Sequence, residues 1–480
     1  MSVALRTAAP AAIGVLVVLA VAVLALSPKS EDVAPGGSSP VSPRERAVAG
    51  MLAHLGELQR IADEHGGNRA AGTPGYRASV AYVTGRLRAA GYVVTVQRMR
   101  FPYFGQRAPP RVQIADTPVS PAGLRTMSYS GAGTATGTLR EIDPRRGERG
   151  ERDAGCIAAD FAGLPGGAVA LVERGTCSLR LKVDNARRAG AGAAIVFNDG
   201  RPGREGAVTG SLGSPGAGIP AVSASYAVGR RLAGREGSRV RVVVRAVSGR
   251  RTTSNVLADL PGTGVRPVVM AGAHLDSVAD GPGINDNGSG VAALLEAARS
   301  LAPQPGERQR RGVRFAFWGA EELGLIGSRH YVRGLGPGER RRIAVYLNLD
   351  MVGSRNAGRF VYFSDEGARA ARVARRVLAQ ADVRLLEIEI GAASDHAPFE
   401  DAGVPVLGLF SGHSEVKTAK QQRLWGGRAG RTFDRCYHQA CDTAERVNRT
   451  ALVELGTGAA ETLRALMSAR LGMARKRLGG

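Results

Sequence analysis

The chain has 480 residues and a formal net charge of +23, and only five of its 65 basic residues are lysine. This length favours two folded domains with extra segments over a single domain. The arginines are scattered along the chain and aromatic residues make up only 5%, which is not the clustered pattern of a nucleic-acid-binding surface. We therefore expect no nucleic-acid partner, although a basic surface favours contact with anionic polymers of a cell envelope.

The N-terminus predicts export. Residues 11–26 are an uninterrupted apolar run behind a single early charge, Arg6. The run is slightly longer than the about 7–15 residues of a signal-peptide core and shorter than the ~20 residues of a membrane span, so cleavage and retention as an anchor remain alternatives. Residues 31–43 are rich in Gly, Ser and Pro and predict a flexible tether. We expect residues 1–43 to precede an extracytoplasmic chain that is either secreted or membrane-anchored.

The folded chain is expected to begin at residue 44. Apolar residues recur at helical spacing in 46–65 and again in 75–90, where Gly91 stands in the usual position after a helix. Residues 92–100 alternate like a strand. Residues 44–119 therefore predict the first part of an α/β domain.

Residues 120–247 differ from their surroundings. They are Gly-rich, with short β-like runs at 168–173, 193–197 and 240–247. The segment 167–198 contains a strand, the turn Arg174-Gly175-Thr176-Cys177, a helix ending in Ala189-Gly190-Ala191 and a second strand, and in this it resembles the protease-associated (PA) domain. An ordinary βαβ unit is the alternative. We interpret 120–247 as a β-rich PA domain inserted into the first domain.

Metal-competent side chains follow three apolar strands. The run 267–273 leads to His274 and Asp276, a Gly-rich loop then carries Asp286, and 291–301 predicts a helix. Residues 251–261 and 313–318 predict further strands, and the latter leads to Glu321 and Glu322. Strand 345–350 ends on Asp350. Later come the Ser-Asp-His motif at 394–396 and the pair Tyr437-His438 between two cysteines.

These residue types predict metal-assisted hydrolysis. The carboxyl ends of strands in an α/β sheet are where such folds place their sites. A site for two ions needs ligands for both and a carboxylate that bridges them, and His, Asp and Glu without free thiolates suit zinc in an open, catalytic arrangement. Two adjacent glutamates allow one to bind metal while the other handles a proton. On its own, a Glu-Glu pair opening a helix is explained by the helix dipole.

Together these motifs resemble the secreted bacterial double-zinc aminopeptidases, from about Arg46 to Asn448 with the PA domain inserted. The resemblance implies an α/β fold with a mixed, mainly parallel twisted sheet flanked by helices, two zinc ions and cleavage of N-terminal peptide bonds. The implied ligands are His274 and Asp350 for one zinc, Glu322 and His438 for the other, and Asp286 as the bridge. The other implied roles are general base for Glu321, oxyanion donor for Tyr437 and orientation of the His274 ring by the Asp276 carboxylate.

The resemblance also bears on the substrate. Met351 and Phe410 match residues that line an apolar pocket for the first side chain, although core packing explains them equally well. Ala393 departs from an Arg that precedes the Ser-Asp-His motif in the family. The resemblance further implies a cis peptide bond between Asp286 and Asn287. His54, His65, His330, His396 and His413 are interpreted as structural or surface residues.

Four cysteines in an exported chain suggest two disulfides. Of the three possible pairings we expect Cys156–Cys177 and Cys436–Cys441, because each pair then lies within one domain. We expect residues 44–119 and 248–472 to form one zinc peptidase domain around the insert, with a basic tail at 473–480. The preferred reading is a monomeric aminopeptidase acting on peptide or protein N-termini. A metallocarboxypeptidase on the same fold and a non-catalytic receptor-like relative are the alternatives.

Overall fold

The structure is a computed structural model that describes residues 42–142, 153–261, 267–302 and 311–469. The targeting segment and most of the tether expected at 1–43, and the basic tail expected at 473–480, lie outside the described residues. The first helix begins at Pro43, in the helix-start position that suits proline. Within the described ranges no helix has the length and apolar character that a membrane crossing requires.

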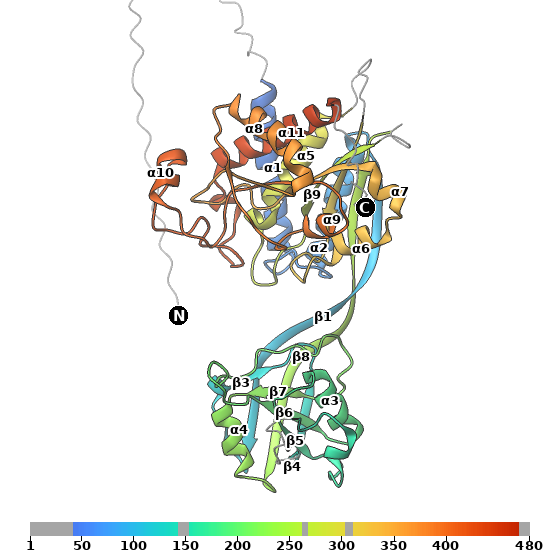
Figure 1. Ribbon diagram of the computed structural model, residues 1–480, viewed down its shortest axis with the longest axis vertical. Coiled ribbons are helices and arrows are strands. Elements are labelled where there is room, and N and C mark those ends of the chain that lie inside the picture. Colours follow the sequence, from blue (N-terminus) through green and yellow to red (C-terminus); the bar gives the residue numbers. More distant parts are fainter. Residues whose placement is uncertain (1–41, 143–152, 262–266, 303–310, 470–480) are drawn as a thin grey trace, which may run out of the picture. The chain divides into compact units, whose positions relative to one another are not determined.

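The main domain is built on a mixed sheet (Figure 1) whose central strand is β9, Val268–His274. β9 runs parallel to β10 on one side and to β11 on the other, and β11 runs parallel to β14. Antiparallel neighbours, β8 and β12, flank this parallel centre. The further strands are β10 Gly312–Trp318, β11 Ile343–Leu349, β12 Phe360–Phe363, β13 Leu386–Glu387 and β14 Val406–Phe410. The strands predicted at 267–273, 313–318 and 345–350 are confirmed to within two residues.

Helices cover both faces of this sheet. Along β10, Phe315 and Phe317 belong to the large core on one face, whereas Ala316 and Trp318 belong to a second core on the other. The first face carries α1 Pro43–Glu64, α2 Pro74–Ala89, α5 Gly290–Ser300, α8 Ala368–Ala379 and α11 Arg449–Ser468. The second face carries α6 Ile326–Gly334 and α9 Ala397–Asp401. The remaining helices are α7 Pro337–Arg342 and α10 Ala419–Trp425. Because both faces are covered, the central strands β9, β11 and β14 are mainly apolar, as their sequences indicate.

Two long strands connect the main domain to the insert (Figure 1). The prediction of separate strands at 240–247 and 251–261 is wrong, because both form the single strand β8, Arg239–Asp259. β8 pairs antiparallel with β1, Val93–Ile114, from Val93 opposite Asp259 to Ile114 opposite Val240. β1 also continues past the end predicted at Arg100. The Ser-Gly-Arg-Arg stretch at 248–251 has the composition of a turn, yet β1 supplies pairing partners there, and this tertiary contact overrides the local preference.

The strands of the insert continue the sheet through the pairing of β4 with β8, and the insert has cores of its own. Strands β4 to β7 run parallel to one another, β3 pairs antiparallel with β7, and β4 pairs antiparallel with β8. The predicted strand–turn–helix–strand unit is present, with Gly190 at φ +89 in the turn between helix and strand. The elements are β2 Thr117–Pro118, β3 Leu124–Thr126, β4 Gly133–Glu141, β5 Val169–Glu173, α3 Leu179–Arg188, β6 Ala193–Phe197, β7 Ala221–Ala224 and α4 Tyr226–Ala233. A disulfide joins Cys156 to Cys177.

Candidate metal centre

The candidate ligands come from the carboxyl ends of neighbouring strands. His274 is the last residue of β9, Asp350 follows β11, and Glu321 and Glu322 follow β10. Because these three strands are parallel neighbours, their carboxyl ends meet at one edge of the sheet. His438 reaches the same place from the loop before α11, at the other end of the main domain's sequence.

Asp286 lies between the two histidines. Its Oδ1 is 3.1 Å from Nε2 of His274, and its Oδ2 is 3.2 Å from Nε2 of His438. Asp350 Oδ1 lies 3.4 Å from the same nitrogen of His274, and Glu322 Oε2 lies 3.0 Å from that of His438. Within the described residues, two groups able to hold a metal ion therefore share Asp286, one with His274 and Asp350 and one with Glu322 and His438.

The donor set fits cations at both positions. The His274 Nδ1 lies 3.0 Å from the backbone oxygen of Asp276, which can only accept a hydrogen bond. Neutral His274 therefore points an Nε2 lone pair at carboxylate oxygens, an arrangement that requires a proton or a cation between them. Two buried carboxylate oxygens near the histidines, Asp350 Oδ1 and Glu322 Oε1, have no hydrogen-bond partner among the described residues. Buried polar atoms left without partners are rare unless an ion or water completes them.

Asp276 has a different contact from the one expected. Its carboxylate Oδ1 is 3.9 Å from His274 Nδ1, and the ring nitrogen instead bonds the backbone oxygen of Asp276. The carboxylate accepts the backbone N–H of Glu321 at 3.1 Å. Asp276 thus contacts the histidine through its main chain and the Glu321–Glu322 turn through its side chain. This turn is not helical, because α6 begins only at Ile326, so the helix-dipole explanation for the Glu-Glu pair does not apply.

Burial and neighbouring charges shift the pKa values of different residues of the cluster in opposite directions. Hydrogen bonds that His438 donates to the Asp286 and Glu322 carboxylates raise the pKa of His438 to about 10. Burial raises the pKa of Glu322 to about 7, and the nearby Asp286 carboxylate adds to this effect. Burial acts to raise the pKa of Asp286 too, but hydrogen bonds from both histidines bring it below its usual value. Four carboxyl groups, of Asp286, Glu321, Glu322 and Asp350, therefore crowd around two histidines, and a divalent cation there would replace protons in offsetting their charge.

Buried side chains hold the loop that carries Asp286. The peptide bond between Asp286 and Asn287 is cis, as the resemblance implied. The two carboxylate oxygens of Asp442 accept the backbone N–H groups of Asn285 and Asp286 at 2.7 and 2.9 Å. Asp434 accepts a hydrogen bond from the Asn285 side chain at 2.7 Å. The sequence does not predict either aspartate as a site residue, and its only indication is that each lies within two residues of a cysteine.

A disulfide closes the loop that carries Tyr437 and His438. It joins Cys436 to Cys441, between the two aspartates that hold the Asp286 loop. The Tyr437 ring stacks on His438 at 3.8 Å between ring centroids and on His413 at 5.0 Å. Burial raises the pKa of the Tyr437 phenol above its usual value, and neighbouring carboxylates raise it further, so the phenol keeps its proton.

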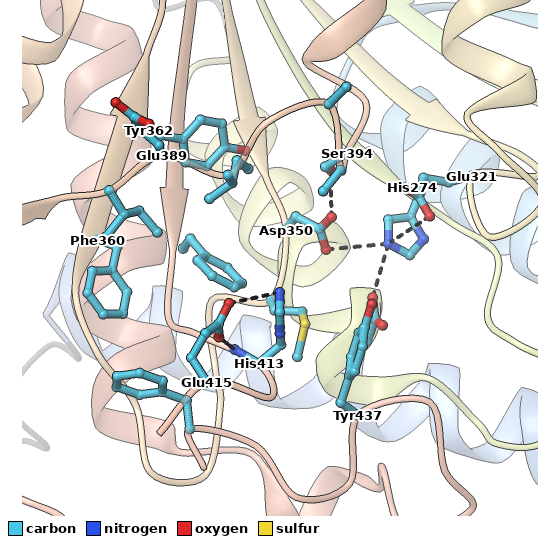
Figure 2. A pocket seen from close by; sticks show the side chains of 18 of the residues that line it. His274, Glu321, Asp350, Phe360, Tyr362, Glu389, Ser394, His413, Glu415 and Tyr437 are labelled. Atoms are coloured by element: carbon cyan, nitrogen blue, oxygen red, sulfur yellow. Dashed lines mark hydrogen bonds and ion pairs between the residues drawn. The ribbon is translucent and has the colours of Figure 1, made fainter. Parts of the chain in front are cut away.

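An open pocket of about 660 Å³ adjoins the cluster (Figure 2). Met351 and Phe410 line it, together with Phe360 and Phe433. Residues not expected in this pocket from sequence also line it, namely Arg329, Glu389, His413 and Glu415. Ala393 lines it as well, and Arg329 is the one arginine among the described residues that line it. Arg329 lies in α6, Glu389 in the loop before α9, and His413 and Glu415 in the loop after β14, so no local pattern groups them.

The Ser-Asp-His motif at 394–396 contacts the cluster through a hydrogen bond to Asp350. The Ser394 hydroxyl donates to Asp350 Oδ2 at 2.6 Å, a contact drawn in Figure 2. Asp395 accepts a hydrogen bond from the Ser328 hydroxyl at 2.5 Å. His396 is buried, with Nε2 2.8 Å from the Gly391 oxygen, and belongs to neither ligand group. Ser394 therefore positions a candidate ligand, and His396 has a structural place.

Comparison with known proteins follows the same division of the chain. The model of Peptidase family M28 matches residues 255–463, and the PA domain model matches residues 136–232. An aminopeptidase of Pseudomonas aeruginosa is 40% identical over 429 residues, 85% of this chain and 79% of that protein. A probable lipoprotein aminopeptidase of Mycobacterium tuberculosis is 40% identical over 85% of this chain and 83% of its own. A zinc aminopeptidase from Bacillus subtilis has a TM-score of 0.57 and 25% identity, covering 90% of this chain and 97% of that one.

A mixed α/β sheet that gathers two histidines and four carboxylates at its strand ends, beside an open pocket, defines a metal-dependent hydrolase. The chain belongs to peptidase family M28, carries a PA domain, and is a zinc metallopeptidase of the aminopeptidase type.

Proposed function

We propose that the chain is an exported enzyme that binds two zinc ions and hydrolyses the first peptide bond of peptides with apolar N-terminal residues. The observation that carries the proposal is the position of Asp286, with each carboxylate oxygen beside a different histidine. This is the arrangement that a carboxylate bridging two ions requires. His274 and Asp350 would hold one zinc, and Glu322 and His438 the other. When bound, the zinc ions supply Lewis-acid polarisation of the scissile carbonyl and acidify water.

Glu321 is assigned as the general base. It lines the pocket, and its Oε2 lies 4.0 Å from His274 Nε2, so it reaches the cluster from the side that substrate enters. Its backbone is fixed by the Asp276 carboxylate. In the forward direction Glu321 takes the proton of the attacking water, and it then gives that proton to the leaving amine.

Tyr437 is assigned as the donor to the carbonyl oxygen as negative charge develops there. Its phenol remains protonated for the reason given above, and its ring is held between two imidazoles. A donor positioned before the reaction costs no reorganisation when the charge appears. Met351, Phe410, Phe360 and Phe433 form the apolar wall that would receive the first side chain. Arg329 is a cation of this pocket that could contact substrate oxygens.

Three observations support an extracytoplasmic location: the apolar run at 11–26, two disulfides, and the lipoprotein named among the relatives. Activity is tested with purified protein and two substrates, leucine anilide with a free amine and the same compound N-acetylated. We expect cleavage of the free amine only, abolished by a chelator and restored by zinc. Cleavage of the acetylated anilide, or preferential release of C-terminal residues from peptides, would contradict the proposal.

A further inference from the structure

A second cavity, of about 1370 Å³, borders the metal centre. Glu322 lines both this cavity and the pocket that contains Met351 and Phe410. Asp276 and Leu323, which adjoin the candidate ligands, line it as well. The metal centre therefore has cavities on two sides, and only the first is used by the assignments above.

The walls of the second cavity are part of the main domain. They come from α2, the start of the β1–β8 ribbon and the loop after β9. Phe101 at the start of this ribbon is fully buried in one apolar cluster with Ala71 and Ala320. The ribbon is thus packed against the loop that leads to Glu321, and the cavity does not depend on the rest of the insert.

The cavity is lined by unpaired positive charge. No side-chain hydrogen bond or ion pair engages its five arginines within the described part of the chain, and Arg251 only stacks over the Tyr103 ring at 3.4 Å. We call this space the arginine cavity, after Arg77, Arg88, Arg98, Arg107 and Arg251. Of the carboxylates that line it, Asp276 is engaged by the Glu321 backbone and Glu322 by His438. Asp280 is exposed, so arginines outnumber the available acids.

A peptide held for N-terminal cleavage needs two spaces. Its first side chain occupies one side of the scissile bond, and the residues after that bond must leave on another. Arginine guanidinium groups bind carboxylates with paired hydrogen bonds, and a one-signed cleft raises the local concentration of ligands of opposite charge. Binding of residues remote from the reacting bond raises kcat/KM when it helps to hold that bond in place.

We propose that the arginine cavity binds the residues that follow the scissile bond and selects peptides with acidic side chains there. This inference rests on the proposed function and adds a substrate class to it. An acidic side chain of the substrate is then favourable after the scissile bond. It is unfavourable as the first residue, because Glu389 and Glu415 line the pocket that receives that residue.

The test compares two peptides with amidated C-termini, Leu-Gly-Gly-Asp-Asp and Leu-Gly-Gly-Asn-Asn, at low ionic strength. Exposed charge pairs each contribute about 0.2–1 kcal/mol, so two of them favour the acidic peptide in kcat/KM by about twofold to thirtyfold. The ratio is expected to fall toward one in Arg98→Gln/Arg251→Gln and at high salt, where charges are screened. The matched control, Arg86→Gln/Arg372→Gln, removes two exposed arginines that do not line the cavity, and it is expected to keep the ratio.

Equal kcat/KM for the two peptides in the wild type would overturn the inference, as would an equal loss of the ratio in the control variant. Leucine anilide, too short to enter the arginine cavity, reports on the proposed function separately. Fluorescence anisotropy with labelled forms of both peptides measures their binding affinity without relying on turnover. Tighter binding of the acidic peptide supports the inference even if the anilide is not cleaved, and equal binding refutes it even if the anilide is cleaved.

Discussion

The Asp442 carboxylate accepts the backbone N–H of Asp286 at 2.9 Å, across 156 residues of sequence. The same carboxylate accepts the N–H of Asn285, and Cys441 beside it closes the loop that carries His438. One side chain thus ties Asp286, the proposed bridge, to the segment that supplies the candidate ligand His438. We therefore expect a change at Asp442 to disturb both Asp286 and His438.

Asp442→Asn is expected to weaken zinc binding by about 10–100-fold, the usual cost of losing a group that orients a ligand. The amide can accept only one of the two N–H groups, and its own NH2 faces the other. Zinc affinity is measured by competition with a fluorescent chelator. Asp401→Asn, an exposed aspartate at the end of α9, serves as the control. Unchanged zinc affinity in Asp442→Asn would show that the Asp286 loop does not need this anchor.

Glu321→Gln separates chemistry from metal binding. It keeps the size of the side chain but removes the basic carboxylate, so kcat is expected to fall by at least the ~10²–10⁴ typical of a lost general base. Both zinc ions are expected to remain bound. Glu322→Gln is expected instead to weaken the ion shared with His438, and excess zinc should restore part of its activity. A nearly active Glu321→Gln beside a Glu322→Gln that zinc cannot rescue would mean that the roles are reversed.

The number of zinc ions is expected to be two per chain, since two ligand groups share Asp286. Protein freed of metal by dialysis against a chelator is titrated with zinc, and bound metal and activity are followed together. His438→Ala is expected to saturate at one ion. Full activity of the wild type at a single bound ion would contradict the binuclear assignment.

The first-residue pocket is expected to favour leucyl and phenylalanyl substrates over aspartyl and lysyl ones. Preference among apolar residues is expected to be broad, because one methylene in an apolar pocket changes the barrier by only ~1–3 kcal/mol. Anilides of the four amino acids give the relative kcat/KM values. Aspartyl anilide is expected to be the slowest, since carboxylates line the pocket. Fastest turnover of the acidic substrate would show that Met351 and Phe410 do not form the specificity pocket.

The insert is expected to be separable from catalysis. Gly105 pairs with Val247 in the ribbon, so residues 106–246 can be replaced by Asn-Gly, the two-residue turn that suits facing antiparallel strands. Every candidate ligand lies outside the removed segment, and zinc binding and cleavage of leucine anilide are expected to be retained. Circular dichroism checks that the shortened chain is folded. A folded deletion variant without zinc would refute the separation.

Local sequence was sufficient for the elements that place the site. The strands before His274, Glu321 and Asp350, and the helix after Asp286, could be predicted because apolar periodicity depends on near neighbours in the chain. The resemblance to a family added the assignment of individual roles, and the division into domains led to the pairing of the cysteines. The candidate ligands follow parallel strands. Because the carboxyl ends of such strands meet at one edge of the sheet, predicting the strands nearly suffices to predict that these side chains lie close together.

Only the tertiary structure decided what holds those side chains in position. The length of β8, the anchoring of the Asp286 loop by Asp442 and the backbone contact of His274 all depend on groups brought together by folding. Arg329 and His413 enter the pocket, and five arginines line the second cavity, through the same long-range packing. A hydrogen bond or a cavity wall joins residues that are near in space, and the spacing of residues along the chain carries no record of that proximity.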